Sequence, residues 1–137
     1  MKSEPTDLNT ARRTFDRLAS RYDQHAALEQ EVASRLLERL DFHRIPPQRI
    51  VDLGSGTGQA SAALKNRFRK AQVIGLDCSA GMLAQQQRRS GLLRPLKAVC
   101  ADFSAIPLAG RSSELVFSNL AIHWSVESEK LFTEIRR

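Results

Sequence analysis

A glycine-rich turn that directly follows a short apolar segment constrains the fold of this chain more than any other feature. The apolar segment is Arg49–Leu53, and the turn has glycine at every second position from Gly54 to Gly58. Residues 59–68 then have the spacing of a helix. Glycine has no Cβ atom, so such a turn can be tight and a ligand can touch its backbone. This order of elements indicates an α/β fold with a ligand at the turn.

The alternation of strand and helix continues along the chain. Three more apolar segments are predicted strands, at 72–76, 96–100 and 114–118, and helices are predicted at 79–89 and 126–137. Such alternation favours parallel strands joined by right-handed crossovers. We therefore predict a Rossmann-like, doubly wound parallel sheet.

The segment before the sheet has a different pattern. Residues 1–10 are predicted to form a loose tail, and apolar residues recur at three- and four-residue steps over 15–40, which predicts two helices. Pro46 and its neighbouring proline end the helical pattern. We predict an N-terminal helical cap, 1–45, and a sheet domain, 46–137.

Acidic and polar residues follow the predicted strands. Asp77 ends the second strand, 19 positions after Gly58 (77 − 58), where a carboxylate can accept hydrogen bonds from ribose hydroxyls. Asp102 follows the third strand and can accept a hydrogen bond from the exocyclic amine of adenine, with Phe103 beside the ring. Met82 can supply an apolar wall. These residues indicate a nucleoside-type site at the carboxyl ends of the strands.

A nicotinamide or flavin site is the competing interpretation. The dinucleotide fingerprint has the spacing G-x-G-x-x-G. The glycines at 54, 56 and 58 have the spacing G-x-G-x-G instead. The spacing therefore argues against a dinucleotide.

Three segments resemble the motifs of class I S-adenosylmethionine-dependent methyltransferases. These are Val51–Gly58, Gly75–Leu83 and Ala101–Phe103. The resemblance implies S-adenosyl-L-methionine as cofactor and a sheet in the order 3-2-1-4. It also implies seven strands in all, so we expect the fold to be C-terminally incomplete at Arg137, with strand 114–118 as an open edge that supports self-association.

Within this superfamily the chain is most similar to malonyl-acyl carrier protein O-methyltransferases, which act early in biotin synthesis. The segments that carry this resemblance are 15–26, 118–124 and 131–137. The implied acceptor is the free carboxylate of a malonyl thioester on acyl carrier protein or coenzyme A. Two alternative functions stay open. One is a repurposed or non-catalytic methyltransferase-like assembly factor, and the other is a methyltransferase for another small molecule.

The resemblance also implies a set of site residues. Those expected to bind the cofactor are Tyr22, Asp52, Gly54, Ser55, Gly56, Gly58, Asp77, Cys78, Met82, Asp102, Phe103 and Asn119. Those expected on the acceptor side are His25, His123 and Trp124. Four of these residues have a purely structural alternative. Tyr22 can pack a helix, His25 and His123 can make surface contacts, and Trp124 can fill the core.

The implied chemistry needs no general base, and no catalytic residue is assigned. A malonyl carboxylate is already ionised at neutral pH, so alignment and exclusion of water suffice. A phenol or amine acceptor would more often require a base, for which only His25 and His123 are candidates.

The charge and the cysteine and histidine content narrow the kinds of partner and metal site that the chain can have. The net charge of +6 comes from basic residues spread along the chain, which favours a solvated basic surface over a nucleic-acid site, although an acidic carrier protein also fits. Cys78 and Cys100 make no disulfide framework, and the histidines and cysteines lack zinc-ligand spacing. We expect no metal, no membrane contact and a cytoplasmic location.

Overall fold

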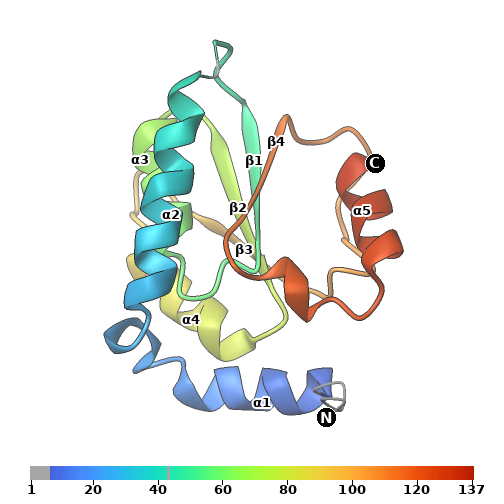
Figure 1. Ribbon diagram of the computed structural model, residues 1–137. Coiled ribbons are helices and arrows are strands. Elements are labelled where there is room, and N and C mark those ends of the chain that lie inside the picture. The colour runs from blue at the N-terminus through green and yellow to red at the C-terminus, as the bar shows by residue number, and fades with distance from the viewer. Residues whose placement is uncertain (1–6, 43) are drawn as a thin grey trace.

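The computed structural model describes residues 7–42 and 44–137 and contains one four-stranded sheet. The strands are β1 (Arg49–Leu53), β2 (Gln72–Asp77), β3 (Lys97–Cys100) and β4 (Leu115–Ser118). All pair in parallel, in the order β3-β2-β1-β4, which confirms the predicted fold class and strand order (Figure 1). β1 and β2 therefore lie at the centre.

Helices cover both faces of the sheet. They are α1 (Leu8–Leu18), α2 (Ala27–Arg39), α3 (Gln59–Arg67), α4 (Ala80–Arg89) and α5 (Ser128–Arg136), with 3-10 turns at Tyr22–Gln24, Leu40–Phe42 and Ile122–Trp124. Figure 1 shows α2, α3 and α4 on one side of the sheet and α5 on the other. The first helix, α1, lies across the edge formed by the carboxyl ends of the strands and packs on α4.

The alternating residues of β1 supply both halves of the core. Ile50 is fully buried against Leu64 of α3 and Phe117 of β4. Val51 and Leu53 point the opposite way, toward Leu131 of α5. This two-residue period places the two apolar clusters on opposite faces of the sheet.

Some predicted details are wrong. Residues 1–6 of the predicted tail lie outside the described residues, but 8–10 are helical, because the Asp7 side chain accepts a hydrogen bond from the amide of Asn9 and begins α1 there. The apolar residues Leu131, Phe132 and Ile135 of the predicted helix 126–137 all suggest burial, but Phe132 is 52% exposed. The buried stripe of α5 runs through Leu131 and Ile135, four residues apart, and Phe132 lies beside it.

The end of α4 also differs from the prediction. The sequence predicts that Gly91 closes this helix, because glycine commonly follows a helix end. The helix instead ends at Arg89, and its C-cap Ser90 has φ −67° and ψ 125°, an extended conformation that needs no glycine. The hydroxyl of Ser90 accepts a hydrogen bond from the amide of Leu96, which fixes the start of the next strand. The division into a cap, 1–45, and a sheet domain, 46–137, stays a prediction.

Candidate cofactor site

The register of the sheet brings the carboxyl ends of all four strands to one edge. Leu53 is in register with Leu76 and with Ser118, and Asp77 is in register with Cys100. The residues that follow the strands therefore surround one cavity of about 170 Å³, which α1 and the 3-10 turn at Tyr22–Gln24 also line. This edge is where parallel α/β sheets bind ligands, at the point where β1 separates β2 from β4.

The glycine turn forms the floor of this cavity. Gly54 has φ +69°, and a Cβ atom on it would lie 2.2 Å from the Cβ of Ala121, so no side chain fits. Gly56 has φ +54° and open space where a Cβ would be. The amides of Gly54 and Ser55 donate to the carbonyl of Leu76, at 2.8 and 3.1 Å, which ties the turn to β2.

Asp77 is held directly against this turn. Its Oδ2 accepts a hydrogen bond of 2.9 Å from the amide of Gly56, and its Oδ1 accepts one of 2.9 Å from the amide of Ser79. Burial raises the pKa of the Asp77 carboxyl, while these two amides oppose the rise. The carboxylate is therefore oriented by backbone on both sides and faces the cavity.

A second, smaller cavity lies between α2 and the glycine turn and shares Gly54, Gly56 and Asn119 with the first. Asp52 lines it and is 1% exposed; its Oδ2 accepts a 2.6 Å hydrogen bond from the hydroxyl of Ser61. Burial is the main cause that raises the pKa of Asp52 to about 7.

Unpaired acceptors gather around this second cavity. Within the described residues, Asp52 Oδ1, Asn119 Oδ1 and the hydroxyl oxygen of Ser55 are buried without a hydrogen-bond partner. Buried polar atoms are nearly always paired, so this cluster calls for a ligand or water. The amide oxygen of Asn119 can only accept a hydrogen bond, and so can the carboxylate oxygen of Asp52 when Asp52 is ionised. The missing partner is therefore a hydrogen-bond donor, and a cationic donor best complements the carboxylate.

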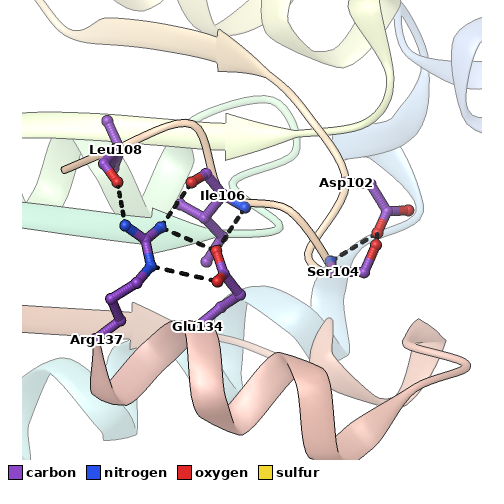
Figure 2. A network of polar contacts seen from close by, with 6 residues as sticks. All are labelled: Asp102, Ser104, Ile106, Leu108, Glu134 and Arg137. Carbon is purple, nitrogen blue, oxygen red and sulfur yellow. Dashed lines mark hydrogen bonds and ion pairs between the residues drawn. The ribbon is translucent and has the colours of Figure 1, made fainter. Parts of the chain in front are cut away.

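The loop after β3 supplies the opposite wall. Asp102 Oδ1 accepts hydrogen bonds from the amide and the hydroxyl of Ser104, at 2.7 and 2.6 Å (Figure 2). Phe103 lines the cavity and also packs on the apolar cluster around Leu53. Met82, at 2% exposure, lines the cavity from α4.

The N-terminal segment closes the cavity and is tied to it by the carboxylate of Asp23. Asp23 accepts a 2.6 Å hydrogen bond from the hydroxyl of Thr57 in the glycine turn and pairs with Arg89 of α4. The Tyr22 side chain is therefore held at the cavity wall, where burial, and then the charges of Glu29, Asp77 and Asp23, raise the pKa of its phenol.

Aromatic side chains from both ends of the chain meet at this wall. The ring of Phe15 makes edge contacts with Tyr22 and Trp124, at centroid distances of 6.2 and 5.5 Å. Trp124 lines the cavity and is 36% exposed, so it belongs to the cavity rim and not to the core.

The structure brings most of the predicted site residues together. The first cavity is lined by Tyr22, Gly54, Gly56, Asp77, Cys78, Met82, Asp102, Phe103, Asn119 and Trp124, and the second by Asp52 and Ser55 as well. Gly58, His25 and His123 line neither cavity. Gly58 begins α3 at φ +82° beside Gln86, and both histidines are exposed. Their predicted roles stay predictions.

Several lining residues were missed from the sequence. They are Leu8, Ala11, Arg12, Phe15, Glu29, Ser104, Leu120, Ala121, Ser125, Val126 and Glu127. The helical spacing of Leu8, Ala11 and Phe15 shows an apolar face, but the sequence does not say that this face covers the strand ends. No cluster of metal-ligating side chains is found among residues 7–42 and 44–137. None of the described helices is both long and apolar enough to cross a membrane.

Comparisons with known proteins agree with this architecture. The family described as "Methyltransferase domain" matches residues 51–137, so the chain belongs to the methyltransferase domain family. The chain is 45% identical, over 135 residues, to a malonyl-[acyl-carrier protein] O-methyltransferase of Halorhodospira halophila, with 98% of this chain aligned. It spans about half of that relative, 46%.

Solved structures show the same fold. A chain in a complex between a methyltransferase activator and a methyltransferase of Haloferax volcanii superposes with a TM-score of 0.78 at 24% identity, covering 90% of this chain and 54% of that one. The plantazolicin methyltransferase BpumL was solved in complex with S-adenosylhomocysteine (SAH). It superposes with a TM-score of 0.66 at 16% identity, covering 95% of this chain and 49% of that one. These likenesses bear on the fold alone.

Proposed function

We propose that this chain forms the S-adenosylmethionine-binding part of a methyltransferase. The observation that carries the proposal is that the glycine turn, Asp77 and Asp102 converge on one cavity at the strand ends. The name of the relatives, malonyl-[acyl-carrier protein] O-methyltransferase, and the match to the methyltransferase domain family support this cofactor. When bound, S-adenosylmethionine supplies a methyl group activated by the sulfonium.

The residues present fit each part of this cofactor. Asp77 is the acceptor for the ribose hydroxyls, because it is a buried carboxylate oriented by backbone amides. Asp102 and Phe103 take the adenine. The unpartnered acceptors of Asp52 and Asn119 suit the ammonium of the methionine part, which is a cationic donor.

The acceptor we propose is the ionised carboxylate of a malonyl thioester on acyl carrier protein or coenzyme A. Neither His25 nor His123 lines the cavity, so neither of these two histidines is in place as a base for a phenol or amine. A malonyl carboxylate needs no base, and the rim formed by Phe15, Tyr22 and Trp124 would exclude water from the reacting groups. A place in biotin synthesis and a cytoplasmic location belong to the same proposal.

The test is transfer of a labelled methyl group from S-adenosylmethionine to malonyl-carrier protein by the intact protein. We expect a base-labile methyl ester on the malonyl group. Acetyl-carrier protein is the matched control, because it lacks the free carboxylate and should take up no label. If the protein binds SAH but methylates no malonyl thioester, the acceptor is another molecule or the protein is a non-catalytic assembly factor.

A further inference from the structure

We propose that Glu134 and Arg137, at the end of α5, are positioning residues that hold the loop after β3 so that Asp102 and Phe103 face the adenine of the cofactor. The proposal rests on the function proposed above. It concerns the loop 101–108, which runs from the cavity to the C-terminal end of α5.

The two side chains bind the loop through its backbone (Figure 2). Glu134 Oε2 accepts a 2.9 Å hydrogen bond from the amide of Ile106. Arg137 donates from Nη2 to the carbonyl of Ile106, at 2.8 Å, and from Nη1 to the carbonyl of Leu108, at 2.7 Å. Glu134 and Arg137 also pair with each other, at 2.9 Å. One ion pair thus holds three backbone groups of the loop.

This ion pair differs from the other one on the same helix. Lys130 and Glu127 are also three residues apart, but Lys130 is 63% exposed and bonds only to Glu127 within the described residues. The Glu134 side chain is 19% exposed. The bond to Arg137, and then the amide of Ile106, lower the pKa of the Glu134 carboxyl, so it stays ionised at neutral pH.

The anchored residue of the loop, Ile106, is close in sequence to Asp102 and Phe103, the residues proposed to bind adenine. Asp102 Oδ1 accepts two hydrogen bonds from Ser104, so residues 102–104 form a local turn that lies two residues before the anchored Ile106. Oδ2 of Asp102 accepts no hydrogen bond from the described residues and is left for a ligand. The loop contains no helix or strand, and its backbone bonds from Ala101 to Asp77 and from Ala105 to Asp102 hold only the end next to β3. The anchor at Ile106 fixes the other end, and we infer that it sets the direction of Asp102.

The preference of the protein for a ligand that carries the exocyclic amine can be measured. A general loss of stability would not change this preference. S-inosylhomocysteine has a carbonyl oxygen where SAH has this amine, so a correctly placed Asp102 favours SAH. The ratio of the two affinities therefore reports the position of Asp102. We expect Glu134→Ala to lower this ratio about tenfold, the loss of one hydrogen bond to a charged group. Lys130→Ala, the matched control, should leave the ratio unchanged.

The experiment is calorimetric titration of the intact protein and each variant with SAH and with S-inosylhomocysteine, alongside a thermal melt. Arg137→Lys keeps the positive charge but loses the two hydrogen bonds to the carbonyls of Ile106 and Leu108, so it should give an intermediate affinity ratio. This variant keeps the test usable if Glu134→Ala does not fold. An unchanged ratio in Glu134→Ala or Arg137→Lys overturns the positioning role. If the unaltered protein binds neither ligand, the proposed function itself has failed and the positioning role falls with it.

Discussion

The carboxylate of Asp16 in α1 accepts a hydrogen bond of 2.6 Å from the hydroxyl of Ser79, the residue that caps α4. The same oxygen accepts a 2.9 Å bond from the amide of Gly81, where a Cβ atom would lie 2.9 Å from the carbonyl oxygen of Asp16. Ser79 follows Asp77 by two residues. The first helix is thus joined directly to the end of β2, the strand that carries Asp77, the proposed ribose acceptor.

Asp16→Ala should weaken both closure of the cavity and binding of the cofactor. It leaves the hydroxyl of Ser79 and the amide of Gly81 without their acceptor, at a cost of about 1–2 kcal/mol in unfolding free energy. Urea unfolding and SAH titration of the intact protein measure the two effects. Arg13→Ala, an exposed change on the same helix, is the control and should alter neither. Normal SAH affinity in Asp16→Ala would show that α1 does not support the site.

Asp52 should make the ligand-free protein less stable as the pH rises. Its folded pKa is about 7 and its ordinary value is 3.8, so between these values the folded state holds a proton that the unfolded state has lost. The contribution of Asp52 to unfolding free energy therefore falls with rising pH, by at most about 4 kcal/mol. Asp52→Asn removes this dependence.

Urea unfolding at pH 5 and pH 7.5 checks this sign for the intact protein without ligand. The raised pKa of Asp77 acts in the same direction but is present in both proteins, so it largely cancels in the difference. Asparagine still accepts the hydrogen bond from Ser61. A wild-type protein that gains stability relative to Asp52→Asn over this interval would show that Asp52 is stabilised as a carboxylate.

Salt should slow methyl transfer to a carrier-bound substrate. Arg13, Arg17 and Arg21 are exposed on the segment that also lines the cavity, so an acidic carrier would approach a positive surface. The rate at low substrate should fall as salt rises, because ions screen this attraction. Malonyl-pantetheine, which lacks the carrier, should show little change. Equal salt dependence for both substrates would remove the case for carrier docking at this surface.

The 137-residue chain by itself should associate and show no turnover. β4 is an edge strand of the described sheet, and its residues Leu115, Val116 and Phe117 are apolar. An open, apolar strand edge invites pairing with another chain. Size-exclusion chromatography with light scattering should show a dimer or larger species, and the methyl-transfer assay should show no product. A stable monomer with normal turnover would contradict this expectation.

The sheet could be predicted because its signals are local. The bounds of β1 match the apolar run between the prolines and Gly54, and Ser79, the first residue of the predicted helix 79–89, caps α4. The acidic strand ends at Asp77 and Asp102 follow from the same alternation. The family resemblance supplied the strand order, which periodicity alone does not determine.

The closure of the site could not be predicted, because it depends on contacts between distant segments. Asp16 and Ser79 are 63 positions apart, and Glu134 reaches Ile106 across 28 positions. Nothing in the local pattern of α1 shows that its apolar face covers the strand ends. The exposure of His25 could not be predicted for the same reason. His25 ends a 3-10 turn, which its sequence neighbours do not reveal.

Calorimetric titration of the intact protein with SAH, compared with its Asp77→Ala variant, tests most directly whether the cavity at the strand ends is a cofactor site. We predict one SAH site per chain. We also predict that Asp77→Ala weakens binding by about 1–3 kcal/mol, because two ribose hydroxyls lose a charged acceptor. Cys100→Ala, an exposed change at the end of β3 that lines neither cavity, should bind SAH as the unaltered protein does. Equal affinity in the Asp77→Ala variant and the unaltered protein would place the ribose elsewhere and contradict the proposed site.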